Sequence, residues 1–124
     1  MTVEFFPSAD EQSQVWEFID QIEDKKAQKK ILATLEAMET MDFEGLYKAE
    51  VLRKIGNDLY EIRIQFRNIA YRILCVIRKA AFWLLHAFIK KSQKTPSRMV
   101  NIANARIKDL DLMLPRRMFG SASV

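Results

Sequence analysis

The sequence predicts an α+β domain: an N-terminal helix pair packed on a small twisted antiparallel sheet, followed by a C-terminal helix. Apolar residues recur at helical spacing up to about residue 41, and their spacing changes to a period of two from Leu59. A chain of 124 residues is long enough for one hydrophobic core and too short for two. We therefore expect a single domain over residues 1–110 and a flexible tail over residues 111–124.

The chain is expected to begin with an edge strand at residues 3–6, which Pro7 ends. Ser8 and Glu11 have the spacing of a capping box, so the first helix should cover residues 9–22. Its buried stripe has the spacing i, i+3, i+4, i+7 and consists of Val15, Phe18, Ile19 and Ile22.

A second helix, antiparallel to the first, is predicted at residues 25–41. Its apolar stripe consists of Ala27, Ile31, Leu35 and Met38. Residues 42–47, which include Gly45, are predicted to form a turn, and residues 51–54 a short strand. Gly-Asn-Asp at residues 56–58 is a strong turn signal in front of the main sheet.

The main sheet is predicted from Leu59 onward, where apolar and polar residues alternate. One face of this strand carries Tyr60, Ile62, Ile64 and Phe66, and the other carries Glu61, Arg63, Gln65 and Arg67. Residues 70–78 and 82–88 are apolar on both faces, which is typical of central strands covered on two sides. A tight turn at residues 79–81 joins them into a hairpin.

The last helix is predicted to start with Thr95 as its N-cap and Pro96 in the first helical position. It should end near Leu110 and turn Ala103 and Ile107 inward. We expect the helices to cover one face of the sheet, so that the other face stays partly open and basic.

Charge is distributed unevenly along the chain, whose net charge is +4. The first 50 residues carry five lysines against twelve acidic residues, whereas the rest carry fifteen lysines and arginines against four acidic residues. This separation predicts a basic surface built by the second part of the chain. Such a surface suits an extended polyanion such as RNA.

Several function classes are excluded by motifs that the sequence lacks. It has no cysteine–histidine cluster, no His-Glu-x-x-His, no glycine-rich phosphate loop and no Gly-x-Ser-x-Gly, so we expect no metal and no other cofactor. His86 is the single histidine, which excludes a paired-histidine ribonuclease. Cys75, the single cysteine, lies in an apolar strand and is expected in the core. With no signal peptide or membrane-length apolar stretch, we expect a cytoplasmic protein without a membrane partner.

Four short motifs follow one another in the second part of the chain. They are Leu-Tyr-Glu-Ile-Arg at 59–63, Tyr-Arg-Ile-Leu at 71–74, Leu-Leu-His-Ala-Phe-Ile-Lys-Lys-Ser-Gln-Lys-Thr-Pro at 84–96, and a helix carrying Ala103, Ala105 and Arg106. In order and spacing they resemble the RelE/HigB-like toxins of bacterial type II toxin–antitoxin modules, in their phage-derived branch. The resemblance covers about residues 52–110, and the preceding helix pair fits the order of elements in that family.

The resemblance implies the RelE-like fold, with two helices on a twisted antiparallel sheet, and an mRNA endoribonuclease that usually depends on the ribosome. It also implies a cognate antitoxin as partner, often a helix-turn-helix DNA-binding protein. By family position, Arg72 is the arginine of the Tyr-Arg motif, and Arg63 lies where relatives carry lysine or arginine. Lys91 lies where a catalytic arginine or lysine follows the last strand.

Metal-free RNA cleavage needs chemical groups that these residues supply. The 2′-OH attacks the adjacent phosphate, so a base must accept its proton, cations must stabilise the phosphorane, and an acid must protonate the leaving oxygen. Arg63 and Arg72 are the candidates for the phosphate, since guanidinium forks match phosphate oxygens, and the resemblance adds Lys91. Glu61, on the strand face of Arg63, is the candidate base. Contacts with the RNA backbone are expected from Lys54, Lys90, Lys94 and Arg98.

Structural interpretations of the same residues stay open at this point. Glu61 and Arg63 also fit a solvated strand face with an i, i+2 ion pair, and the lysines after the last strand fit a solvated turn. His86 is better explained as a core or rim histidine than as a proton shuttle. Its parity along the strand is that of Phe82, Leu84 and Phe88.

Two other functions fit the resemblance. One is a non-catalytic binding protein on the same scaffold that inhibits DNA gyrase by contact. The other is an inactive copy that acts only as a transcriptional co-repressor with its antitoxin. Cleavage of RNA separates the endoribonuclease from both.

Overall fold

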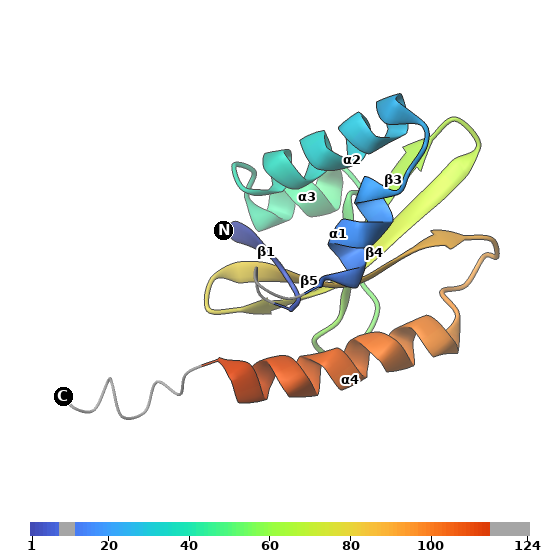
Figure 1. The fold of residues 1–124 in the computed structure, drawn as a ribbon. Coiled ribbons are helices and arrows are strands. Elements are labelled where there is room, and N and C mark those ends of the chain that lie inside the picture. Colours follow the sequence, from blue (N-terminus) through green and yellow to red (C-terminus); the bar gives the residue numbers. More distant parts are fainter. Residues whose placement is uncertain (8–11, 115–124) are drawn as a thin grey trace.

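The computed structural model describes residues 1–7 and 12–114, in which five strands form one mixed sheet (Figure 1). The strands are β1 Thr2–Phe5, β2 Leu52–Lys54, β3 Tyr60–Phe66, β4 Ile69–Arg78 and β5 Ala81–Lys90. Their order across the sheet is β1-β5-β4-β3-β2. The predicted antiparallel arrangement is correct for β2 to β5, but β1 pairs parallel with β5. Alternation within a strand of four residues says nothing about its partner or direction.

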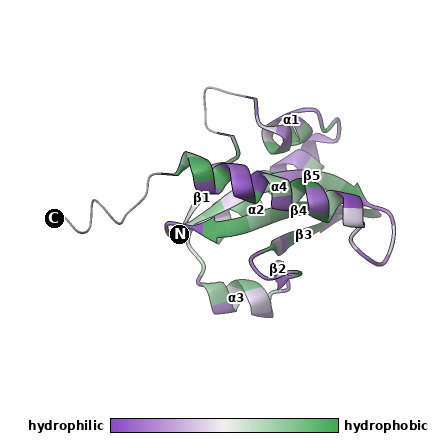
Figure 2. Cartoon of the chain, turned by 90° about the horizontal axis from the view of Figure 1, so that it is seen from below, coloured by the Kyte–Doolittle hydropathy of each residue, from purple (hydrophilic) through white to green (hydrophobic). Residues whose placement is uncertain are grey.

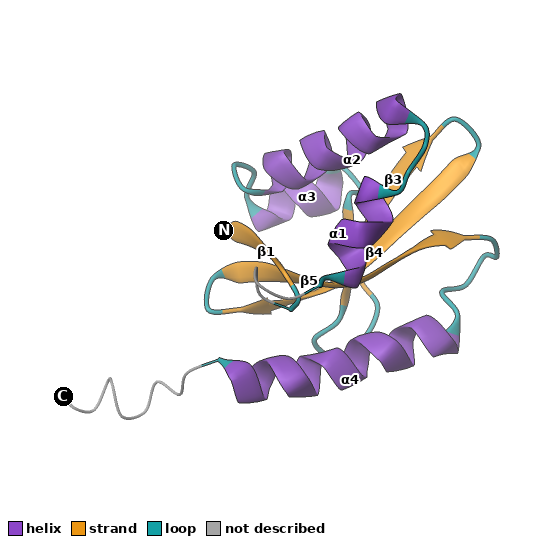
Figure 3. Cartoon of the chain, viewed as in Figure 1, coloured by secondary structure: helices purple, strands orange, loops and turns teal. Residues whose placement is uncertain are grey.

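Within the described ranges, four helices flank the sheet: α1 Gln14–Asp20, α2 Lys25–Met38, α3 Phe43–Lys48 and α4 Ser97–Met113 (Figure 3). The first three pack on one face and α4 packs on the opposite face (Figure 1). The expectation that all helices cover a single face is therefore wrong. Among these helices none combines the length and apolar character that a membrane crossing requires.

The two faces of the sheet belong to two separate hydrophobic cores. Ile31 of α2 packs with Ile73 of β4 on one face, and Ile107 of α4 packs with Leu74 and Leu85 on the other. Hydrophobic residues accordingly run along the central strands (Figure 2). The prediction that β4 and β5 are central strands covered on both sides is confirmed.

α1 is shorter than the helix predicted over residues 9–22. Its N-cap is Ser13, whose Oγ accepts a hydrogen bond from the backbone N–H of Trp16 at 3.2 Å. The predicted capping box of Ser8 and Glu11 lies outside the described residues.

The chain between α2 and β2 contains a helix that the sequence did not indicate. α2 begins as predicted after Asp24 but ends at Met38. Residues 42–47, predicted as a turn, lie mostly in α3, whose N-cap Asp42 accepts a hydrogen bond from the Gly45 N–H at 2.7 Å. A Cβ atom on Gly45 would lie 2.9 Å from Oδ1 of Asp42. Gly45 therefore permits a close capping contact inside a helix and does not mark a turn.

α4 begins one residue later than predicted and extends further. Thr95 precedes the N-cap, which is Pro96 and has no side-chain cap hydrogen bond. The helix continues to Met113, so the tail predicted over residues 111–124 starts inside α4. Residues 115–124 lie outside the described ranges.

A β-bulge in β5 places His86 on the α4 side of the sheet. Leu74 pairs with His86, whereas the next residue of β4 pairs with Leu84, so one residue of β5 is extra. The predicted shared parity of His86 with Phe82 and Leu84 is therefore wrong, because those two side chains belong to the core under α1 and α2. The parity with Phe88 is correct, and the two rings stack with centroids 6.2 Å apart.

Candidate nucleic-acid interface

Two arginines face each other on neighbouring strands. Arg63 of β3 and Arg72 of β4 are register partners, so their side chains leave the same face of the sheet. This is the face against which α4 packs, since Leu74, two residues after Arg72, contacts the α4 core. Like charges placed opposite each other are destabilising. An anion bound between the two guanidinium groups would relieve that repulsion.

Arg72 is only 7% exposed, and its three nitrogens have different surroundings. Nη1 donates to the carbonyl of Tyr71 at 2.9 Å. Nε lies 3.6 Å from Oε1 of Glu61, an ion pair without a hydrogen bond. Nη2 bonds to no residue that the structure describes. Burial lowers the pKa of Arg72, Glu61 opposes that shift and Arg63 adds to it. An arginine remains charged under these influences, so one nitrogen of a cationic fork is available.

Glu61 is 3% exposed and contacts both Arg72 and Thr95. The Thr95 hydroxyl donates to Oε2 of Glu61 at 2.5 Å, while Oε1 faces Arg72. The alternative of a solvated Glu61 paired with Arg63 is therefore wrong: the carboxylate is buried and its ion pair is with Arg72.

A cleft of about 350 Å³ lies where β3 extends beyond β2. Its lining combines residues of α2, of the segment before β2 and of the two arginine-bearing strands: Lys30, Thr34, Ala49, Glu50, Val51, Arg63, Ile64, Gln65 and Arg72. Nζ of Lys30 donates to the carbonyl of Gln65 at 2.5 Å. Three cationic side chains from three elements thus border one cleft.

The predicted lysines at the end of β5 and after it take different places. Lys90 ends β5 opposite Ala70, so by alternation it shares the face of Arg72. Lys91 is exposed one residue beyond β5 and makes no hydrogen bond or ion pair within the described ranges. Lys94 lines a second cleft of about 370 Å³ at the start of α4, together with Ile55, Thr95, Ser97, Val100 and Asn101. Lys94 and Arg72 therefore line separate clefts. Glu61 contacts one lining residue of each cleft, Arg72 in the first and Thr95 in the second.

Lys54 does not share the face of Glu61. Lys54 is the register partner of Tyr60, whereas Arg53 is the partner of Glu61. Arg53 is exposed, and among the described residues its side chain forms one ion pair, a long contact of 3.9 Å with Glu50. Of the two basic residues in β2, Arg53 is thus the one on the arginine-bearing face.

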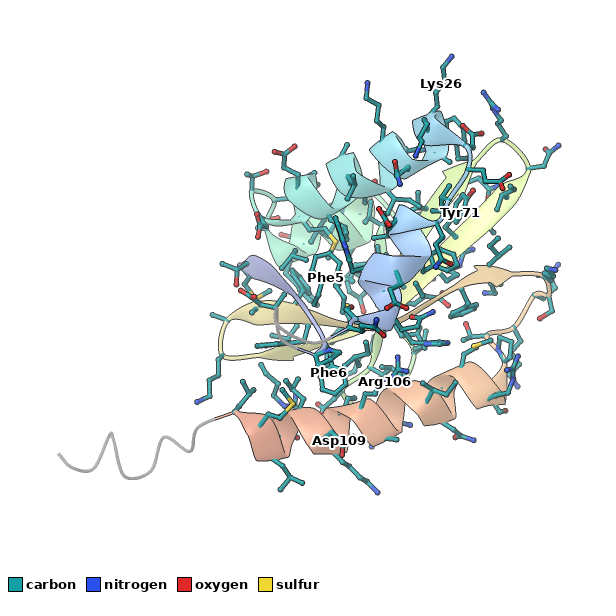
Figure 4. All side chains as sticks on the ribbon, viewed as in Figure 1. Phe5, Phe6, Lys26, Tyr71, Arg106 and Asp109 are labelled. Atoms are coloured by element: carbon teal, nitrogen blue, oxygen red, sulfur yellow. The ribbon has the colours of Figure 1, made fainter. Side chains whose placement is uncertain are left out.

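His86 lies against α4 and is 9% exposed. Nη1 of Arg106 lies 3.2 Å from Nδ1 of His86 and donates to the carbonyl of Leu85 at 2.5 Å. Arg106 extends from α4 toward the sheet (Figure 4). Burial, together with Arg106 and then Arg98, lowers the pKa of His86 to about 4. The predicted core or rim position is confirmed, and the charge of Arg98 acts on this ring.

Sequence reasoning missed the contributions of Thr95, Lys30 and Arg53. Thr95 carries a usable signal, Thr before Pro, but that signal pointed to a helix cap. Lys30 belongs to a lysine-rich helix face that resembles any solvated surface. All three become site residues only through relations between separate segments: Thr95 with Glu61, Lys30 with Gln65, and Arg53 through its register with Glu61.

Among the described residues, no group of three or more His, Cys, Asp or Glu side chains is arranged to hold a metal ion. Cys75 is fully buried in the core, and burial raises the pKa of its thiol. This agrees with the prediction of a small core residue rather than a nucleophile.

Comparison with known proteins places the chain in a family. Residues 12–108 match the phage derived protein Gp49-like family (DUF891), a span that includes every described element except β1 and the last turn of α4. No curated protein matches the chain. Since the match covers most of the 124 residues, the chain belongs to the Gp49-like family of phage-derived proteins, a toxin-like family of the RelE/HigB type.

Proposed function

We propose that the protein is the toxin of a type II toxin–antitoxin module and an mRNA endoribonuclease that blocks translation. Membership of a toxin-like family supports the first part. The observation that carries the second part is the opposed pair Arg63 and Arg72 on one cleft. Two arginines directly opposite each other on neighbouring strands are unfavourable by themselves and favourable around a phosphate.

Cleavage proceeds without a metal. The 2′-oxygen of the RNA attacks the adjacent phosphorus, the bond from phosphorus to the 5′-oxygen breaks, and the products are a 2′,3′-cyclic phosphate and a 5′-OH. The 2′-OH gives up one proton and the leaving oxygen gains one, so no other reactant is consumed. Arg63 and Arg72 hold the non-bridging oxygens, with Lys91 as the third cation, and stabilise the charge of the phosphorane. Glu61 is the sequence-based candidate for accepting the 2′-OH proton.

The surrounding cations guide the RNA strand. Lys90, Lys94 and Lys54 carry charge along the segments that flank the arginines, and Arg98 adds to it at the start of α4. Such contacts hold the phosphate backbone without reading the bases. The proposal includes mRNA on the ribosome as substrate, hence a cytoplasmic site of action, and a cognate antitoxin as the partner that blocks it.

The test is to map mRNA 5′ ends in cells after brief expression of the protein. Arg72→Gln removes one guanidinium of the pair, and Lys108→Gln removes the same charge from the exposed side of α4. New 5′ ends inside reading frames are expected with wild type and Lys108→Gln and not with Arg72→Gln. Co-expression of the neighbouring gene's product should suppress them if it is the antitoxin.

Other results decide against the proposal. Unchanged cutting by a folded Arg72→Gln variant would show that the arginine pair does not act on the phosphate. Arrested growth with intact mRNA would favour a gyrase-inhibiting binder, and normal growth with intact mRNA an inactive co-repressor.

A further inference from the structure

Three side chains from three separate segments, Thr95, Glu61 and Arg72, contact one another in that order. Thr95, between β5 and α4, donates to Oε2 of Glu61 in β3 at 2.5 Å. Oε1 of Glu61 lies 3.6 Å from Nε of Arg72 in β4. Glu61 is 3% exposed and Arg72 7% exposed, so little solvent weakens either contact. The connection ties the lysine-bearing segment 91–96 to the arginine that lines the cleft.

We propose that Glu61 and Thr95 are positioning residues: together they orient Arg72 toward the substrate phosphate and hold segment 91–96 against the sheet. Glu61 then acts through Arg72 and is not the proton acceptor of the reaction. This inference rests on the proposed RNA cleavage for its kinetic consequences. Its structural consequence, the orientation of Arg72, is independent of any activity.

The surroundings of Glu61 argue against proton transfer. A general base must come within about 3.2 Å of the hydroxyl that it deprotonates, directly or through one water. Both carboxylate oxygens already face protein groups, Thr95 on one side and Arg72 on the other. At 3% exposure, Glu61 also leaves almost no surface for a 2′-OH to approach.

The same contacts suit an orienting role. A buried guanidinium without a partner is strongly unfavourable, so the Glu61 carboxylate, 3.6 Å from Nε, draws the Nε side of Arg72 toward itself. Nη1 is held by the carbonyl of Tyr71, and Nη2 bonds to no described residue. Nη1 is thus held by a hydrogen bond and Nε faces the Glu61 carboxylate in an ion pair without a hydrogen bond, which leaves Nη2 for a phosphate oxygen.

The start of α4 supplies an independent observation on Thr95. Threonine before proline is suited to cap the helix, and a side-chain cap stabilises the start of a helix. Here Pro96 occupies the N-cap position without a side-chain hydrogen bond, and the Thr95 hydroxyl points to Glu61. The hydroxyl thus serves the connection to Arg72 and leaves the helix without a side-chain cap.

The first experiment observes Arg72 directly. The Nε–H signal of Arg72 is followed by ¹⁵N NMR in wild type, Thr95→Val, Thr95→Ser and Thr40→Val during titration with inorganic phosphate. Valine matches threonine in shape and lacks the hydroxyl, whereas serine keeps it. Thr40→Val is the matched control, because its hydroxyl contacts only the carbonyl of Ala37 on an exposed helix end. We expect Thr95→Val to shift the Arg72 signal and weaken phosphate binding, and Thr95→Ser to restore most of the wild-type behaviour.

The second experiment measures cleavage of mRNA on programmed ribosomes. Thr95→Val should lower kcat/KM roughly 10- to 100-fold, because a displaced group in a reacting site has an effect of that size. Glu61→Gln should lower the rate and keep the shape of the pH–rate profile. If the pH–rate profile of Glu61→Gln no longer shows the fall in rate at low pH, Glu61 is the base and the inference is overturned.

The two experiments keep the two proposals apart. If wild type binds phosphate at Arg72 but cuts no RNA, the proposed function fails, and the NMR comparison still decides the role of Thr95. An Arg72 signal and phosphate affinity unchanged by Thr95→Val would refute the positioning role even in an active enzyme.

Discussion

Nη1 of Arg106 lies 3.2 Å from Nδ1 of His86, at the bulge where β5 meets α4. Because a guanidinium only donates hydrogen bonds, Nδ1 accepts, and the imidazole is neutral with its proton on Nε2. Burial and the neighbouring charges of Arg106 and Arg98 lower the pKa of His86 to about 4.

Stability should therefore depend on His86 in mildly acidic solution. The folded-state pKa is below the ordinary value of 6.5, so the unfolded chain binds the proton more readily. The contribution of His86 is fully present above about pH 6.5 and is lost as the pH falls toward 4. NMR titration of the single histidine and Tm measured against pH check this. A His86→Phe variant should lack this part of the pH dependence, and an ordinary histidine pKa in wild type would contradict it.

Replacing Arg63 should separate stability from activity. Arg63→Gln removes the charge opposite Arg72, which should raise the free energy of unfolding by about 0.5 kcal/mol. The same change removes one phosphate donor and should lower RNA cleavage roughly 100-fold or more. Thermal melts and cleavage assays on the purified variant measure both, with Lys108→Gln as the charge control. A variant that is less stable and fully active would contradict the assignment.

Glu61 and Arg72 should show energetic coupling. Glu61→Ala leaves Arg72 buried without its partner, which should lower the free energy of unfolding by roughly 3 kcal/mol or more. Glu61→Gln and Arg72→Met, measured singly and together by urea unfolding, should give a coupling energy of about 1 kcal/mol or more. Additive effects would mean that the 3.6 Å contact contributes nothing.

Gly45 should be required only while Asp42 caps α3. Asp42→Ala should destabilise the protein by about 1 kcal/mol through loss of the cap. Gly45→Ala should destabilise the wild type, because its Cβ would lie 2.9 Å from Oδ1 of Asp42. In the Asp42→Ala background the same change should be neutral or stabilising, since alanine favours helix more than glycine. Urea unfolding of the four proteins is the measurement, and an equal loss in both backgrounds would contradict the explanation.

Local patterns predicted much of the fold. Alternation in residues 60–66 and two apolar runs predicted β3, β4 and β5, and helical spacing predicted α2. The predictions that failed concern residue types that fit two different structural roles. The local pattern predicts a turn at Gly45 and a helix cap at Thr95, whereas the actual roles of these residues depend on Asp42 and Glu61.

The sequence by itself determined which segments alternate, which are buried on both faces, and that a charged Arg72 stands inside an apolar strand. Only the tertiary structure decided that Arg63 faces Arg72, that Glu61 joins Arg72 to Thr95, and that the bulge turns His86 toward α4. Periodicity assigns a residue to a face of its own element. Register between strands, and contacts between residues 34 positions apart such as Glu61 and Thr95, follow from how the whole chain packs.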